Sequence, residues 1–172
     1  MGFMLNIKVV LVCSCLFLFM EPAAAARNTK IEVLGALKAD LNEVLAATTD
    51  LHKACYDRDE QKVAVTLEAL VQKIEKAGKK STMEKRNHPH LVRILNAAKG
   101  QLLQSQASNG KSRSKSLSKA FGQLVLLAKV YKLKRYPMFF CSKDKATWLQ
   151  SGWKAKNPIN PVRWGSCGSP IR

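Results

Sequence analysis

The apolar residues of this 172-residue chain recur at helical spacing in four separate stretches. An amphipathic helix produces this pattern, because residues three and four positions apart share one helix face. The four apolar stripes are Leu34, Leu37, Leu41, Val44, Leu45, Thr48, Leu51 and Cys55; Val63, Leu67, Leu70, Val71 and Ile74; Leu91, Ile94, Leu95, Ala98, Leu102 and Leu103; and Leu117, Phe121, Leu124, Val125, Ala128 and Tyr131. Short links favour antiparallel neighbours, so the pattern predicts an all-α fold, an antiparallel four-helix bundle over residues 27–135. We expect Leu41, Leu67, Ile94 and Leu124 to share one core.

Capping and turn-forming residues separate the four stretches. Asp59 suits an N-cap, because its carboxylate can accept a hydrogen bond from an unpaired N–H of the first turn. Pro89 suits the first turn of a helix, where a missing N–H costs nothing. The expected boundaries are Lys30 to Cys55 for the first helix, Asp59 to Gly78 for the second, a start at Pro89 for the third, and, for the fourth, a start after the Ser/Lys-rich stretch that follows Asn109 and Gly110 and an end before Arg135 and Pro137.

Residues 1–26 have the features of a secretory signal peptide. Lys8 precedes an apolar run from Val9 to Met20, and an Ala-x-Ala pattern ends at Ala26. A membrane anchor is the alternative, but a spanning helix needs about 20 apolar residues and this run is interrupted at Glu21. We therefore expect cleavage after Ala26, a periplasmic or secreted product, and no transmembrane segment in the mature chain.

The formal net charge of +17 favours anionic partners. Three basic clusters stand out: Lys79, Lys80, Lys85 and Arg86; Lys111, Arg113, Lys115 and Lys119; and Lys132, Lys134 and Arg135. Base stacking would need aromatic side chains among these charges, yet only Tyr131 and Tyr136 are near them. An anionic lipid or polymer surface is thus favoured over nucleic acid. The alternative is a solvated basic surface without a partner.

The C-terminal segment, residues 136–172, contains all three tryptophans and shows no helical period. Alternating runs are too short to predict a sheet, so we expect an irregular, ordered tail packed on the bundle. Three cysteines lie outside the signal peptide, and an oxidising compartment favours pairing two of them. Cys141 and Cys167 share the tail while Cys55 lies on a helix, so the tail pair is predicted, with a stabilisation of about 3 kcal/mol.

The tail also carries four short motifs in a fixed order. They are Phe140-Cys141, Trp148-Leu149-Gln150, Lys156-Asn157-Pro158 and Cys167-Gly168. In order and approximate spacing they resemble the family known as domain of unknown function 3347, an exported helical domain found alone or fused to periplasmic adaptor subunits of copper and silver efflux systems. The resemblance implies an accessory role in envelope metal handling, or a module that binds an envelope or efflux protein. Ser142 and Lys143 stand where the family has Pro-Met after the first cysteine, and Trp164 stands where it has a methionine before the second.

Bundle geometry offers a different metal site. The third helix should begin at the end of the bundle where the fourth helix finishes, which would bring His88 and His90 near Met138. Imidazole and thioether groups suit Cu(I) or Ag(I). The alternative is that both histidines lie on the surface and Met138 belongs to the core. No Cys-x-x-Cys-His, Gly-x-Ser-x-Gly or His-Glu-x-x-His motif occurs, so covalent haem and the commoner hydrolytic mechanisms have no support, and a non-enzymatic binding protein is predicted.

Overall fold

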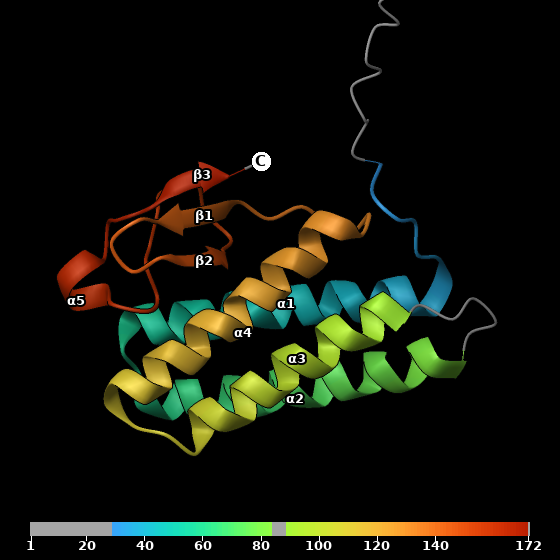
Figure 1. Ribbon diagram of the computed structural model, residues 1–172, viewed down its shortest axis with the longest axis horizontal. Helices are drawn as coiled ribbons and strands as arrows, with labels where there is room; N and C mark the ends of the chain where they lie inside the picture. The colour runs from blue at the N-terminus through green and yellow to red at the C-terminus, as the bar shows by residue number, and fades with distance from the viewer. Residues whose placement is uncertain (1–28, 84–88, 172) are drawn as a thin grey trace, which may run out of the picture.

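The structure is a computed structural model that describes residues 29–83 and 89–171. Residues 1–26, for which a signal peptide is predicted, and His88 lie outside this part of the chain. The elements are α1 (Gly35–Asp57), α2 (Glu60–Met83), α3 (Pro89–Gln106), α4 (Gly110–Val130), β1 (Met138–Cys141), β2 (Ala146–Leu149), α5 (Pro161–Trp164) and β3 (Ser169–Ile171). The protein is therefore mostly helical, with a small sheet near the C-terminus (Figure 1).

The long helices form two antiparallel hairpins, α1 with α2 and α3 with α4 (Figure 1). The helix hairpins share one apolar core, which contains the four residues expected there, Leu41, Leu67, Ile94 and Leu124. That prediction is confirmed. Strand β2 packs mainly on α4, and α1 makes only small contacts with α4 and with β2. Phe139, Trp148 and Leu149 of the sheet belong to the same core as the helices. The sheet thus completes a side of the core that a regular bundle would close with helix–helix contacts alone.

The helix boundaries follow local chemistry in part. Asp59 caps α2 as predicted, since its Oδ1 accepts a hydrogen bond of 3.0 Å from the backbone N–H of Lys62. Gly78 does not end α2, which continues to Met83. A glycine inside a helix lowers stability by only about 1 kcal/mol relative to alanine. Ala77 and Ser81, on either side of Gly78, are buried on the inner face, and this burial stabilises the helix beyond the glycine. The Ser/Lys-rich stretch belongs to α4 itself rather than to a link before it.

The expectation of an irregular tail is wrong. The tail folds into a three-stranded antiparallel sheet in the order β2-β1-β3. Each strand has only three or four residues, too few for a visible alternation. The sheet forms because β1 pairs with β2 across a short turn and with β3 from the end of the chain, so strand pairing rather than the pattern of any one strand decides it. The disulfide between Cys141 and Cys167 is confirmed.

Close packing ties the tail to the rest of the core. Trp148 is fully buried and its ring stacks on Phe139, with 6.0 Å between ring centroids. A Cβ added to Gly168 would lie 3.0 Å from the Trp148 ring and 2.9 Å from the Cβ of Ala155. Only glycine therefore fits beside the tryptophan. Among the described helices, none is long and apolar enough to cross a bilayer.

Candidate anion-binding site

The N-terminal segment is held against the end of α4. The backbone N–H of Ile31 donates to the carbonyl of Val130 over 2.8 Å, and Lys132 donates back to Ile31 over 2.9 Å. This pairing brings Lys30 to the last turn of α4, where its ammonium donates a 2.8 Å hydrogen bond to the carbonyl of Ala128. Carbonyls of a last helical turn lack partners within the helix and attract cations. Lys30 therefore sits at the negative end of α4 by simple capping chemistry.

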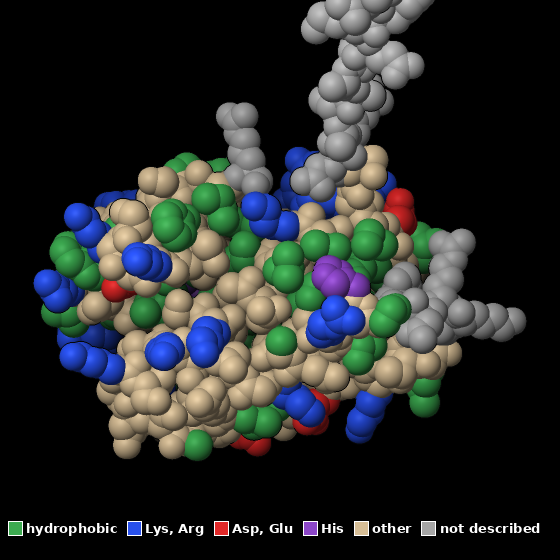
Figure 2. Space-filling model, in the orientation of Figure 1, with side chains coloured by type: hydrophobic (Ala, Val, Ile, Leu, Met, Phe, Trp, Pro, Cys, Tyr) green, Lys and Arg blue, Asp and Glu red, His purple; other side chains and the backbone are tan. Residues whose placement is uncertain are grey.

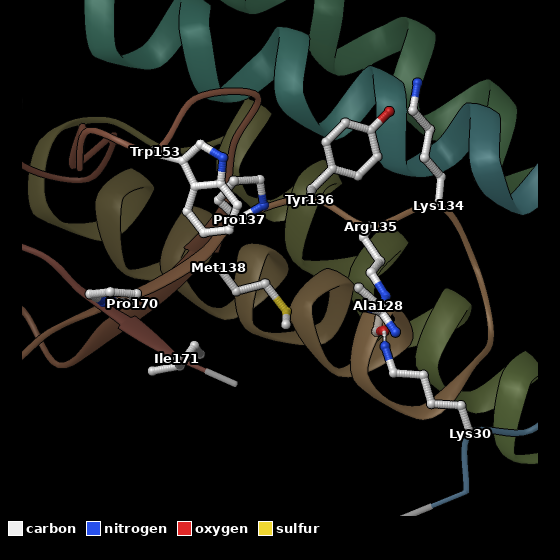
Figure 3. Close-up of a pocket in the computed structure, with 10 residues that line it drawn as sticks. All are labelled: Lys30, Ala128, Lys134, Arg135, Tyr136, Pro137, Met138, Trp153, Pro170 and Ile171. Atoms are coloured by element: carbon white, nitrogen blue, oxygen red, sulfur yellow. Dashed lines mark hydrogen bonds between the residues drawn. The ribbon is translucent and has the colours of Figure 1, made fainter.

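Next to Lys30 lies a cavity of about 460 Å³, between the end of α4, the link to β1 and the edge of the sheet (Figure 3). Its lining residues are Lys30, Ala128, Lys134, Arg135, Tyr136, Pro137, Met138, Trp153, Pro170 and Ile171. Lys30 and Arg135 converge near Ala128 at one end, whereas Lys134 points away from the cavity beside Tyr136. Met138, Pro170 and Ile171 make an apolar wall. The cavity thus has a cationic end and an apolar body.

Strand pairing and the tail loop position the apolar wall. Met138 begins β1 and lies between Leu149 on β2 and Ile171 on β3. Trp153 comes from the loop after β2 and is 81% exposed, whereas the other two tail tryptophans, Trp148 and Trp164, are buried and half-buried. An indole exposed at the rim of an apolar cavity is typical of a binding surface, because its ring gains from an apolar contact while its N–H stays near water.

Gln150 fixes the shape of the loop that carries Trp153. Its amide nitrogen donates to the carbonyls of Gly152 (2.6 Å) and Lys154 (2.7 Å). Its amide oxygen accepts from Trp148 Nε1 (2.9 Å) and from the backbone N–H of Lys156 (3.0 Å). Every hydrogen-bonding position of this buried side chain is thereby used. The loop around Trp153 is consequently a constrained structure.

Each of the three basic clusters of the sequence has a member that forms an ion pair. Arg113 pairs with Glu60, Lys80 with Asp40, and Lys132 with Glu32 over 3.2 Å. Lys30, Lys129, Lys134 and Arg135, here called the cationic face, form no ion pair with any acidic residue in the described part of the chain, and neither do Lys79, Lys111, Lys115 and Lys119 of the other clusters. The cationic face differs from those clusters in its position, because Lys30, Lys134 and Arg135 line the cavity. Partial burial, followed by repulsion from Arg135 and Lys129, lowers the pKa of Lys30. Positive charge is therefore concentrated and uncompensated here.

The space-filling view shows the same bias on a larger scale. Lysine and arginine side chains are spread over this side of the molecule, and acidic side chains are few (Figure 2). Long-range attraction of an anionic partner would add to the local effect of the cationic face.

Among the described residues, His90 and Met138, which were expected to bind metal, do not lie together in one site. His90 is exposed near the start of α3 and does not line the cavity that contains Met138. Cys141 and Cys167 are bonded to each other, so neither sulfur is a free thiolate. Within residues 29–83 and 89–171, no three His, Cys, Asp or Glu side chains lie together as metal ligands would. Binding of Cu(I) or Ag(I) stays a prediction.

His52 and Cys55, which share one face of α1, are both buried. Burial lowers the pKa of His52 to about 4 and raises the pKa of Cys55 to about 12. At neutral pH the imidazole is thus uncharged and the thiol protonated, the states in which each group packs inside a core without a counter-charge.

The tail-motif residues are buried, packed against one another or hydrogen-bonded within the tail. Trp148, Leu149, Asn157 and Pro158 are buried, and Gly168 packs on Trp148. Asn157 donates from Nδ2 to Asp144 over 2.6 Å, and its Oδ1 accepts from the backbone N–H of Ile159 over 2.9 Å. These contacts organise the turn between the sheet and α5, on which the positions of β3 and the cavity wall depend.

Two residues of the candidate site carry no distinct sequence signal. In the sequence, nothing distinguishes Lys30 from other lysines near a helix start, or Trp153 from the other tryptophans of the tail. The pairing of Ile31 with Tyr131, residues 100 positions apart, is what brings Lys30 to the cavity. Arg135 and Met138 were both identified from the sequence, but as members of a basic cluster and a metal site.

Comparison with protein-family models, with curated proteins and with solved structures finds no match to this chain.

Proposed function

We propose that this protein is an exported, non-enzymatic binding protein that attaches to an anionic envelope surface through the cationic face and Trp153. The observation that carries the proposal is the cationic face at the end of α4, whose side chains form no ion pair with a described acidic residue, together with the exposed Trp153 that lines the same cavity as Lys30 and Arg135. A lysine or arginine near an anionic membrane surface contributes about 1 kcal/mol of attraction. Tryptophan favours the boundary between headgroups and acyl chains.

The proposal selects one of the two roles that the sequence suggests. Metal handling would require soft ligands brought together, whereas surface attachment needs cations without internal partners and an exposed aromatic anchor. The described residues supply the second set around one cavity, which Lys30, Arg135 and Trp153 all line. Partner-binding by an envelope protein with an acidic surface would use the same charges and is an outcome of the test below.

The test is co-sedimentation with lipid vesicles, using the protein purified after export of the full chain. We expect binding to vesicles that contain phosphatidylglycerol and none to phosphatidylcholine alone. Binding should weaken steeply with salt, because the screening length falls from about 10 Å at 0.1 M to about 3 Å at 1 M. Binding that is equal for both lipids, or insensitive to salt, would contradict the proposal. A protein partner would then be the favoured target of the cationic face.

Matched charge variants locate the surface. Lys129→Gln/Lys134→Gln removes two charges from the cationic face and should weaken vesicle binding roughly 30-fold, at about 1 kcal/mol per charge. Lys115→Gln/Lys119→Gln removes two exposed charges from an earlier part of α4 and should have a much smaller effect. Equal losses in the two variants would mean that net charge alone drives attachment.

A further inference from the structure

The cavity beside Met138 is large enough to hold part of a small molecule. Its volume of about 460 Å³ lies within the range of roughly 300–1,000 Å³ typical of ligand sites. A surface that only touched headgroups would need exposed cations and no such cavity. The cavity therefore suits a ligand that has one part able to enter it.

The body of the cavity is suited to an aliphatic chain. Pro137, Pro170 and Ile171 expose aliphatic carbon, and the unbranched Met138 side chain can adjust to a chain that enters beside it. Trp153 flanks the opening, where its ring can cover an apolar group (Figure 3). Burial of such a chain would be driven by the apolar area removed from water.

The inner end of the cavity is suited to one anionic head. Lys30 uses one of its three ammonium donors on Ala128, which holds the ammonium in place and leaves two donors free. The Arg135 guanidinium converges on the same point. Repulsion between these two cations and Lys129 contributes to the lowered pKa of Lys30, and an anion bound between them would relieve that repulsion.

We propose that this cavity binds a single-chain anionic amphiphile, with its carboxylate or phosphate head between Lys30 and Arg135 and its chain along Met138, Pro170 and Ile171. The inference rests on the proposed function, because the same cationic face would meet the anionic surface. It adds a specific one-to-one site to a general attraction. The ligand could come from a membrane lipid or from a free fatty acid, which share this chemistry.

Isothermal titration with sodium dodecanoate below its micelle concentration tests the site. We expect one-to-one binding of dodecanoate, no measurable binding of acetate, which has the head without the chain, and none of dodecyltrimethylammonium, which has the chain with a cationic head. Binding of many dodecanoate molecules per protein, or equal binding of the cationic amphiphile, would overturn the inference.

Variants separate the head contact from the chain contact. Lys30→Gln/Arg135→Gln should weaken dodecanoate binding about tenfold or more, as expected for lost hydrogen bonds to a charged group. Met138→Gln keeps the length of the side chain but makes the wall polar, and should weaken binding roughly tenfold. Lys115→Gln/Lys119→Gln is the control and should change affinity by less than about twofold. Unchanged affinity in both cavity variants would overturn the inference, and circular dichroism checks that each variant is folded.

The vesicle and dodecanoate experiments can fail independently. Vesicle binding without dodecanoate binding would leave surface attachment intact and remove the cavity as a ligand site. Dodecanoate binding without vesicle binding would support the cavity and identify a free amphiphile, rather than a membrane, as the source of the ligand.

Discussion

His52 on α1 donates a hydrogen bond from Nε2 to the backbone carbonyl of Lys156 in the tail, over 2.6 Å. The carbonyl can only accept, so Nε2 carries the proton. Burial lowers the pKa of His52 to about 4, the hydrogen bond to Lys156 opposes this shift, and the Lys156 ammonium adds to it. One neutral imidazole thus joins the helices to the loop that carries Trp153.

Stability should fall between pH 7 and pH 5 because of His52. Its folded-state pKa of about 4 lies below its usual value of 6.5, so the unfolded chain takes up the proton first on acidification. The contribution to stability is therefore fully present above pH 6.5 and is lost as the pH falls toward 4. Proton linkage gives a loss of about 2 kcal/mol between pH 7 and pH 5, measurable by urea unfolding.

His52→Gln should remove most of this loss, since its amide can still donate to Lys156 but does not titrate. His90→Gln, a change at an exposed position, is the control and should keep the wild-type pH dependence. Carboxylates whose pKa values are lowered, such as Asp40 and Asp57, become protonated only at lower pH. The change in stability between pH 7 and pH 5 is therefore assigned to histidine. An unchanged pH slope in His52→Gln would contradict the assignment.

Gln150→Met should destabilise the protein by at least about 2 kcal/mol. The substitution nearly keeps the volume but leaves Trp148 Nε1 and three backbone groups of the loop without their partner, and each buried group left unpaired costs about 1–3 kcal/mol. Thermal or urea unfolding measures the loss. If the loop is held by Gln150 as described, the indole of Trp153 should also become more mobile in fluorescence anisotropy; a variant with wild-type stability and anisotropy would show that the network is dispensable.

Gly168→Ala should cost about 1–3 kcal/mol through overpacking, because the new methyl group would lie 3.0 Å from the Trp148 ring. Gly152→Ala is the matched control in the same tail, since its added Cβ meets no atom within 4 Å. Urea midpoints compare the two directly. Equal midpoints would mean that the tail shifts readily to admit the methyl group.

Replacing Cys141 and Cys167 together by serine should destabilise the fold by about 3 kcal/mol, because the disulfide closes a loop of 26 residues in the unfolded chain. Loss of the small sheet should accompany the loss of stability, since the bond joins β1 to the residue just before Gly168 and β3. Cys55→Ala removes a buried, free cysteine of α1 and is the control that keeps the disulfide. Wild-type stability in the double-serine variant would show that strand pairing alone holds the tail.

The helices, the disulfide and one helix cap could be predicted from the sequence. Four apolar stripes were enough to predict the helical fold and its shared core around Leu41, Leu67, Ile94 and Leu124, because burying one face is how an amphipathic helix becomes stable. The position of Cys141 and Cys167 in the same tail, with Cys55 on a helical pattern, was enough to predict the disulfide. The capping role of Asp59 was readable because it depends on neighbouring residues only.

The sheet and the candidate site were decided by tertiary structure. Strands as short as Ser169–Ile171 have no pattern of their own and exist because β1 offers its edge. Lys30 reaches the cavity because Ile31 pairs with a residue at the other end of the helical region. The sequence by itself determined which faces must be buried, through the local periodicity of apolar residues. Only the tertiary structure decided which cations were left without a carboxylate, because charge pairing depends on contacts between residues far apart in the chain.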